Sequence, residues 1–229
     1  MPEDPNLARL QSAATLLGPL LDELLLVGGC VTGLLISDPG AATIRTTVDV
    51  DLVVEAYKYA EYGAFEARMR ARGFVNGLEQ DDPICRWRQN DVCVDLMPTG
   101  DFLGFTNRWY PSALASKVHV QLPNGIPLDH IDAPHFLATK LEALDSRGEG
   151  DPVSSHDAED VILIIDGRPE VMDELAAASE DLRSHVAKGV RGLLDDQLFM
   201  DALSGFFDRA VAVERAMAVR QRMAILRGH

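Results

Sequence analysis

The chain has 229 residues, of which 47% are hydrophobic and 25% are charged. These values are typical of a folded globular protein with one large domain or two small ones, and they exclude a largely disordered chain. Lys and Arg number 21 and Asp and Glu number 36, so the net charge is −15. A surface this acidic repels phosphate backbones and anionic lipids, which excludes a general nucleic-acid coat but leaves room for a local basic patch.

The sequence also bears on the cellular compartment. No apolar run reaches the roughly 18 residues that a membrane-spanning helix needs. The start, Met1–Pro5, lacks the basic residues that open a signal peptide. The three cysteines Cys30, Cys85 and Cys93 are odd in number and widely spaced, which indicates reduced, buried thiols and no zinc site. We therefore expect a cytoplasmic protein.

The first part of the chain alternates helical and strand patterns. Apolar residues at intervals of three and four from Leu7 to Leu24 predict a helix. The apolar run 24–27 then predicts a buried strand, which ends at Gly28 and Gly29 and is followed by a short helix over 30–36. The β-branched residues of 43–54 predict a strand, and 60–72 is typical of a helix.

Two hairpins and a helical region follow. Residues 84–88 and 92–97 flank a turn, and residues 118–122 and 126–128 flank another. After Pro134 the pattern becomes helical, with a helix over 135–144, a polar loop over 147–152 and helices to the end. We therefore predict an α+β fold, with an α/β domain over 1–130 and a helical lobe over 131–229.

Three aspartates stand out because aspartate is disfavoured inside strands. Asp49 and Asp51 alternate with Val48, Val50 and Leu52, so period two places both carboxylates on one face of the strand. Asp95 has the same setting within 92–96. If the two strands are neighbours, three carboxylates gather on one face.

Like charges held that close are costly unless a cation neutralises them, and hard oxygen ligands select Mg²⁺ or Mn²⁺. Asp49, Asp51 and Asp95 are therefore candidate metal ligands. Two such ions can activate a hydroxyl and hold a triphosphate for in-line displacement. The alternative is an exposed strand face on which the carboxylates are simply solvated.

The glycine pair makes the catalytic interpretation more specific. Gly28 and Gly29 follow an apolar strand and precede a short helix. Glycine permits close approach of the backbone to a phosphate, and the start of a helix offers N–H groups. The pair alone is more often a tight turn, but here a strand bearing Asp49 and Asp51 follows about 20 residues later.

With these motifs the chain resembles the nucleotidyltransferase superfamily of polymerase-β-like fold. It resembles more closely the AbiEii-type abortive-infection nucleotidyltransferases, many of which are toxins of toxin–antitoxin pairs. Four motifs carry the resemblance, in the order Gly-Gly, Arg-x-Thr-x-Asp-x-Asp, Leu-x-x-Lys-x-x-Ala and Asp-x-x-Asp. They match Gly28 and Gly29; Arg45, Thr47, Asp49 and Asp51; Leu137, Lys140 and Ala143; and Asp157 and Asp160.

The resemblance implies roles for these residues. It implies that Asp49, Asp51, Lys140 and Asp157 are catalytic and that the first two bind the metal ions. Asp95 lies outside the four motifs, and its strand setting makes it a further catalytic residue and metal ligand. The resemblance also assigns nucleotide binding to a second set of residues, which includes Lys140 again. These are Gly28, Gly29, Arg45, Thr47, Lys140 and Asp160.

The chemistry of the later motifs leaves alternatives open. Lys140 is a compact cation suited to a β- or γ-phosphate, or else a helix lysine paired with Glu142 or Asp145. Asp157 and Asp160 share a helix face, and one of them could orient Lys140 or act as the base for an acceptor hydroxyl. Asp157 could equally be a first-turn acid that the helix dipole favours.

We therefore expect a Mg²⁺- or Mn²⁺-dependent enzyme that transfers a nucleoside monophosphate from a nucleoside triphosphate to a hydroxyl and releases pyrophosphate. The resemblance implies that the acceptor is RNA, such as tRNA, or protein, and that an antitoxin protein is a partner. A small cationic acceptor such as an aminoglycoside is an alternative that suits the net charge of −15. A non-catalytic module that binds a nucleotide or a partner is a second alternative.

Overall fold

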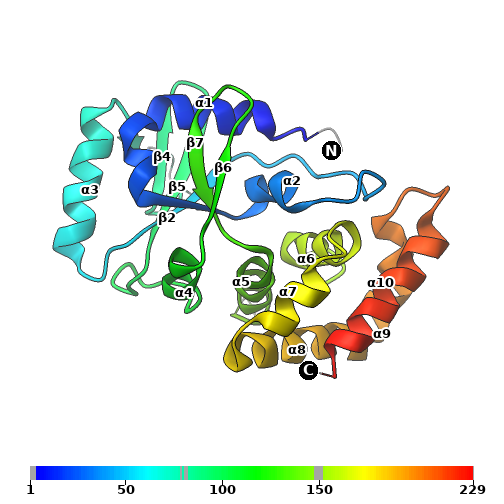
Figure 1. The fold of residues 1–229 in the computed structure, drawn as a ribbon. Coiled ribbons are helices and arrows are strands. Elements are labelled where there is room, and N and C mark those ends of the chain that lie inside the picture. The colour runs from blue at the N-terminus through cyan, green and yellow to red at the C-terminus, as the bar shows by residue number, and fades with distance from the viewer. Residues whose placement is uncertain (1–3, 78, 80–81, 147–151, 229) are drawn as a thin grey trace. The chain divides into compact units, whose positions relative to one another are not determined.

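The structure, a computed structural model, describes residues 4–77, 79, 82–146 and 152–228 (Figure 1). It has an α+β fold, in which a mixed sheet with helices is followed in the chain by a helical region. The predicted fold class is confirmed at this level. The chain forms two compact units, and each is described separately below.

The first unit contains residues 5–31 and 45–132 and holds the sheet. Its strands are β1 (Leu24–Val27), β2 (Val50–Val54), β3 (Val75–Asn76), β4 (Arg86–Gln89), β5 (Val92–Pro98), β6 (Val118–Gln121) and β7 (Pro127–His130). Over the described residues the sheet is seven-stranded, with the order β3-β4-β5-β2-β1-β7-β6. The pairs β2–β5 and β1–β7 are parallel, and the other neighbours are antiparallel.

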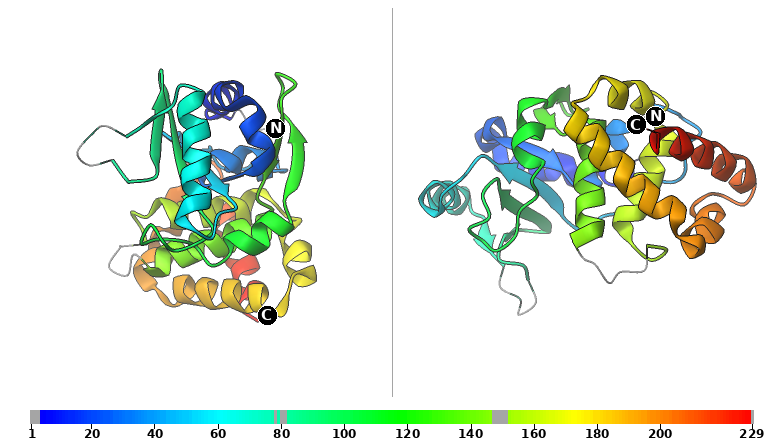
Figure 2. Two further views of the ribbon diagram at one scale, coloured as in Figure 1. Left: turned by 90° about the vertical axis from the view of Figure 1, so that its left-hand side faces the viewer. Right: turned by 90° about the horizontal axis from the view of Figure 1, so that it is seen from below.

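Helices cover this sheet. They are α1 (Leu7–Leu17), η1 (Gly18–Glu23), η2 (Gly29–Val31), α3 (Tyr59–Ala71) and α4 (Tyr110–Ala115). Figure 2 shows α1 and α3 side by side, and Arg72 of the α3 C-cap donates a hydrogen bond to the carbonyl of Leu16 (2.8 Å). The Tyr62 hydroxyl of α3 donates to the Leu96 carbonyl of β5 (2.8 Å). The apolar side chains between these helices and the sheet form the core of the unit.

Among the described residues, the second unit contains 4, 32–44, 133–146 and 152–228 and is helical. Its helices are α2 (Thr32–Leu35), α5 (Ala133–Ser146), α6 (His156–Gly167), α7 (Val171–Ala177), α8 (Glu180–Asp195), α9 (Gln197–Ala202), η3 (Leu203–Phe206) and α10 (Ala212–Leu226). Helix α6 lies at the centre, since nearly all its side chains are buried. The Ser155 hydroxyl caps its start by accepting the N–H of Ala158.

The observed division of the chain differs from a single boundary between 130 and 131, chiefly in the segment 32–44. The break near Asp132 lies close to that boundary, but residues 32–44 group with the helical unit. The N–H groups of Ser37 and Asp38 both donate to the carbonyl of Gly167 at the end of α6 (3.0 and 2.9 Å). These long-range bonds attach the segment to the helices.

Most of the predicted elements are present with shifted ends. Both hairpins are confirmed, as β4–β5 and β6–β7, and the helices predicted over 60–72 and 135–144 are α3 and α5. The helix predicted from Leu7 to Leu24 is wrong at its end, because the α-helix ends at Leu17 and Leu24 opens β1. The loop predicted over 147–152 lies mostly outside the described residues, since only Pro152 is described.

The strand predicted over 43–54 is wrong in its first half, because only 50–54 is a strand. The hydrogen bonds of the preceding residues go to side chains instead of a neighbouring strand. Asn6 accepts the N–H of Thr47 (2.8 Å) and donates to the Arg45 carbonyl (2.9 Å). The segment before Asp49 is therefore a loop that hydrogen bonds attach to Asn6, the residue that precedes α1.

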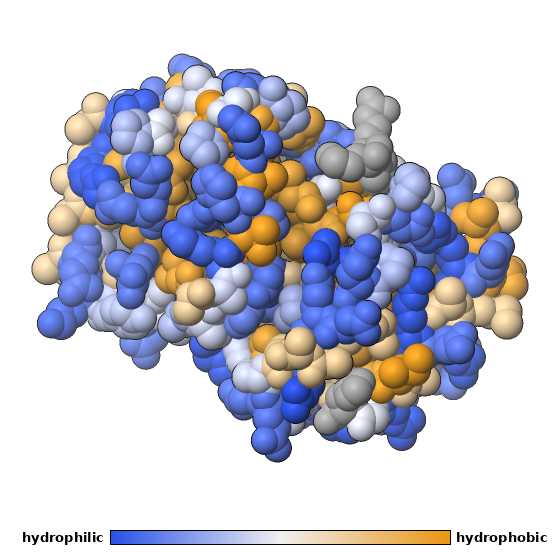
Figure 3. Space-filling view, viewed as in Figure 1, coloured by the Kyte–Doolittle hydropathy of each residue, from blue (hydrophilic) through white to orange (hydrophobic). Residues whose placement is uncertain are grey.

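Within the described residues, no helix is both long enough and apolar enough to cross a membrane. In the space-filling view of Figure 3, hydrophilic side chains predominate on the visible face, with hydrophobic ones scattered among them.

Candidate active site

The three aspartates come together on the sheet. Strands β2 and β5 are parallel neighbours, and their register pairs Asp51 directly with Asp95. Asp49 lies immediately before β2, two residues from Asp51. Since directly paired residues point to the same face of a sheet, Asp51 and Asp95 share one face at this point, and Asp49 is two residues along the chain.

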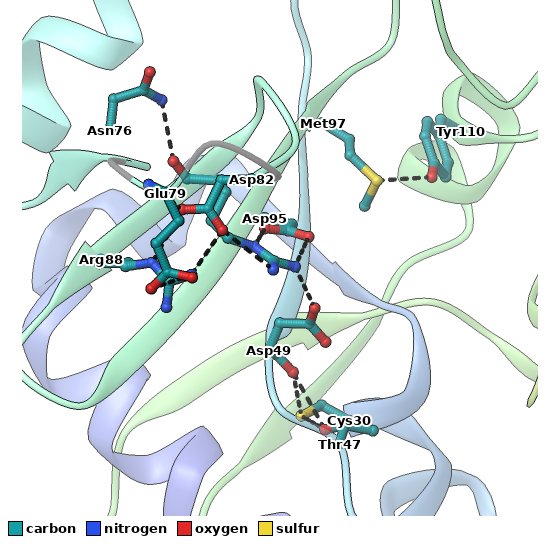
Figure 4. Close-up of polar contacts among 11 residues, drawn as sticks. Cys30, Thr47, Asp49, Asn76, Glu79, Asp82, Arg88, Asp95, Met97 and Tyr110 are labelled. Carbon is teal, nitrogen blue, oxygen red and sulfur yellow. Dashed lines mark hydrogen bonds and ion pairs between the residues drawn. The ribbon is translucent and has the colours of Figure 1, made fainter.

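An arginine that we did not predict lies among these carboxylates. Arg86 of β4 donates from Nε and Nη2 to the two oxygens of Asp95 (2.8 and 2.7 Å). Its Nη2 also donates to Asp49 Oδ2 (2.6 Å), and Asp82 lies 3.7 Å from its Nη1. Figure 4 shows Asp82, Asp95 and Asp49 around this single guanidinium group.

The hairpin register explains the position of Arg86. The turn at Asn90 and Asp91 pairs Gln89 with Val92, which places Arg86 opposite Asp95. Asn90 has a φ of 55°, in the left-handed region that asparagine tolerates and that tight hairpin turns require. The turn sequence was therefore a signal from which this contact could have been predicted.

The charges of this cluster shift the pKa values of nearby groups. The hydrogen bonds with Asp95 raise the pKa of the Arg86 guanidinium above the ordinary value of arginine, so this group remains a cation. Burial, reinforced by the negative charges of Asp95 and Asp51, raises the pKa of the Cys85 thiol to about 12. Burial also raises the pKa of Cys93. All three cysteines are free and buried, which agrees with the prediction of reduced thiols.

The glycine pair lies against these residues. Gly28 follows β1 with a φ of 66°, and a Cβ atom built there would lie 1.9 Å from Oδ2 of Asp51. A Cβ on Gly29 would meet the methyl group of Thr47 at 2.5 Å and the guanidinium of Arg45 at 3.0 Å. The absence of side chains at these two positions thus makes room for three of the predicted site residues.

Thr47 holds the backbone next to Asp49. Its hydroxyl lies 3.0 Å from the Cys30 sulfur and donates to the Asp49 carbonyl (3.2 Å). The Cys30 thiol donates to the same carbonyl (3.2 Å), and Thr47 is only 4% exposed. These contacts fix the loop that carries Asp49. The nucleotide-binding role expected for Thr47 stays a prediction.

Lys140, Asp157 and Asp160 form a second cluster, in the helical unit. Nζ of Lys140 in α5 lies 3.1 Å from Asp157 Oδ1 and 2.7 Å from Asp160 Oδ2, both on α6. The three side chains are 11%, 8% and 1% exposed. Both acids of α6 thus contact Lys140, and a catalytic or nucleotide-binding role for the three residues stays a prediction.

The carboxylates have the donor chemistry for a hard divalent cation. Oδ2 of Asp49 and Oδ2 of Asp95 converge on the same nitrogen of Arg86, so one position already contacts oxygens from two carboxylates. Carboxylate oxygens are the ligands that Mg²⁺ and Mn²⁺ prefer. Among the described residues, however, no three His, Cys, Asp or Glu side chains form a group that could hold a metal ion as they stand.

Comparisons with known proteins leave the family open, because no protein-family model matches the chain and no curated protein is similar to it in sequence. The candidate site is therefore defined by its own geometry.

Proposed function

We propose that this protein is a metal-dependent nucleotidyltransferase with a polymerase-β-like sheet. It would transfer a nucleoside monophosphate from a nucleoside triphosphate to an acceptor hydroxyl and release pyrophosphate. The observation that carries the proposal is the register of Asp51 with Asp95, which joins the carboxylates of two distant sequence segments beside Gly28. A merely solvated strand face would not need a glycine whose missing side chain accommodates one of these carboxylates.

Each residue would have a defined part in this reaction. Asp49 and Asp51 would bind Mg²⁺ or Mn²⁺, with Asp95 completing the site and accepting or orienting the proton of the acceptor hydroxyl. The bound ions would polarise the α-phosphate and neutralise the charge that develops on the leaving pyrophosphate. Gly28, Gly29 and Arg45 would approach the phosphates, the glycines because they bring backbone close and Arg45 through its fork of donors.

The acceptor and setting follow from the resemblance described above. We propose RNA, such as tRNA, or a protein hydroxyl as the acceptor, and a toxin restrained by an antitoxin partner in the cytoplasm. Lys140 and Asp160 as nucleotide ligands, and Asp157 as a catalytic residue, remain part of this hypothesis.

The test is label transfer from each of the four α-labelled nucleoside triphosphates, with Mg²⁺, into total RNA and total protein. We expect one nucleotide to label one class of acceptor. Asp51→Ala should abolish the transfer while the circular dichroism spectrum stays unchanged. Asp22→Ala removes an exposed carboxylate from the same unit and should retain full activity. A fully active Asp51→Ala protein would contradict the mechanism.

A further inference from the structure

Arg86 is enclosed by acidic side chains. Its guanidinium makes the three short hydrogen bonds to Asp95 and Asp49 described above, and Asp82 lies at its remaining nitrogen. The side chains of Arg86, Asp95 and Asp49 are only 18%, 11% and 23% exposed. Ion pairs so shielded from water are stronger and more strictly oriented than those on the surface.

Hydrogen bonds on both sides of β4 hold the backbone of Arg86 in place. The carbonyl of Arg86 accepts the N–H of Gly77 (2.6 Å) and the side-chain amide of Asn76 (3.1 Å). On its other side, β4 is paired with β5 over four residues. The strand therefore presents the guanidinium to the carboxylates from a rigid position.

The guanidinium stands where a cation between these carboxylates would stand. Its Nη2 lies within hydrogen-bond distance of both Asp49 Oδ2 (2.6 Å) and Asp95 Oδ2 (2.7 Å). While these oxygens accept hydrogen bonds from the guanidinium, they cannot also bind a metal ion at that position, because two cations cannot share it. The two arrangements exclude each other.

We propose that Arg86 is a positioning residue that keeps Asp49 and Asp95 converged before a divalent cation arrives, and that it must leave them for the cation to bind. This inference rests on the proposed function, because it concerns the same carboxylates. Asp82 is the residue that would receive the guanidinium. It lies within 3.7 Å of Arg86 and is held in place by Arg88, whose Nη2 is 2.7 Å from Asp82 Oδ1.

The test measures Mn²⁺ binding without nucleotide, by the loss of the free Mn²⁺ electron paramagnetic resonance signal. Arg86→Gln removes the competing cation, so we expect its affinity for Mn²⁺ to exceed that of the unaltered protein about tenfold or more. Arg86→Lys keeps the charge but loses the bidentate contact with Asp95. Its affinity for Mn²⁺ should therefore lie between those of the unaltered protein and Arg86→Gln. Arg68→Gln is the matched control in the same unit, since the exposed Arg68 pairs with Glu23 instead of the site carboxylates or Asp82. Its affinity should equal that of the unaltered protein.

A second measurement uses the unaltered protein and so does not depend on how Arg86→Gln folds. The Nε–H nuclear magnetic resonance signal of Arg86, assigned by its loss in Arg86→Lys, should shift as Mg²⁺ is added. The signal of Arg68, which pairs with Glu23, should stay in place. An Arg86 signal unmoved at saturating Mg²⁺ would overturn the inference.

The outcomes separate this inference from the proposed function. Equal or weaker Mn²⁺ binding by Arg86→Gln would overturn the inference and leave a metal-dependent enzyme intact. Tighter binding by Arg86→Gln, together with no pyrophosphate release by the unaltered protein, would support the inference and contradict the proposed function. No Mn²⁺ binding by any variant would overturn both.

Discussion

The carboxylate of Asp51 occupies the space that a side chain at Gly28 would need. A Cβ atom on Gly28 would lie 1.9 Å from Asp51 Oδ2, far inside van der Waals contact. Gly28 directly follows β1, and Asp51 is the second residue of the neighbouring strand β2. Asp51 can therefore keep its position beside Asp95 only if residue 28 has no side chain.

Gly28→Ala should therefore displace Asp51 and reduce nucleotidyl transfer about a hundredfold or more, because small displacements of catalytic groups are costly. Gly125→Ala is the matched control. Gly125 has a similarly positive φ of 85° but nothing within 4 Å of its built Cβ, so it carries the same backbone strain without the clash. Steady-state kinetics of both variants check this. Equal activities would show that the position of Asp51 does not matter to the reaction.

Lys140 is the cation shared by two nearly buried carboxylates on α6. Lys140→Met should lower the free energy of unfolding by about 3 kcal/mol, because it leaves Asp157 and Asp160 without that partner in a site shielded from water. Lys188→Met, on the exposed face of α8, should change the stability by less than about 0.5 kcal/mol. Urea denaturation measures both. Similar values for the two variants would mean that the Lys140 cluster contributes nothing to the fold.

Arg215 joins the last helix to the segment 32–44. Its guanidinium donates to both oxygens of Asp166 (2.8 Å each) and to Asp38 (2.9 Å), and Asp166 is 1% exposed. Arg215→Met should destabilise the protein by about 3 kcal/mol, and amide hydrogen exchange should rise in residues 36–42. The exposed Arg220 of the same helix supplies the control Arg220→Met. Unchanged exchange in the segment would contradict this account of its attachment.

The raised pKa of the Cys85 thiol predicts a loss of protein stability at alkaline pH. Its pKa is raised from 9.0 to about 12 in the folded protein, so the unfolded chain releases this proton first as the pH rises. The contribution of this pKa difference to the free energy of unfolding is fully present below pH 9. It is lost between pH 9 and 12, by about 1.4 kcal/mol for each pH unit. The free energy of unfolding, measured by urea between pH 8 and 10.5, should fall less steeply for Cys85→Ala. Parallel curves would show that the Cys85 thiol is not protected in this way.

Part of the site could be predicted from the sequence because it depends on local periodicity. The alternation around Asp49 and Asp51 gives one face, and the apolar setting of Asp95 gives a strand. Arg86 was missed because its role depends on the pairing of β4 with β5, although the turn at Asn90 and Asp91 determines that register.

Other features could not be read from local patterns. Residues 32–44 join the helical unit through bonds from Ser37 and Asp38 to Gly167, far away along the chain. The loop before Asp49 is β-rich in composition, but Asn6 and Cys30 satisfy its polar groups in place of a strand. Tertiary hydrogen bonds override strand propensity at such positions.

The central claim is that the bond between the α- and β-phosphates of a nucleoside triphosphate is the one that breaks. The most direct test incubates the protein with Mg²⁺, its acceptor fraction and the same nucleotide labelled either at the α- or at the γ-phosphate. The account predicts that the α-label enters the acceptor and that the γ-label is released as pyrophosphate, with both signals lost in Asp51→Ala. Transfer of the γ-label to the acceptor, or equal release by Asp51→Ala, would contradict it.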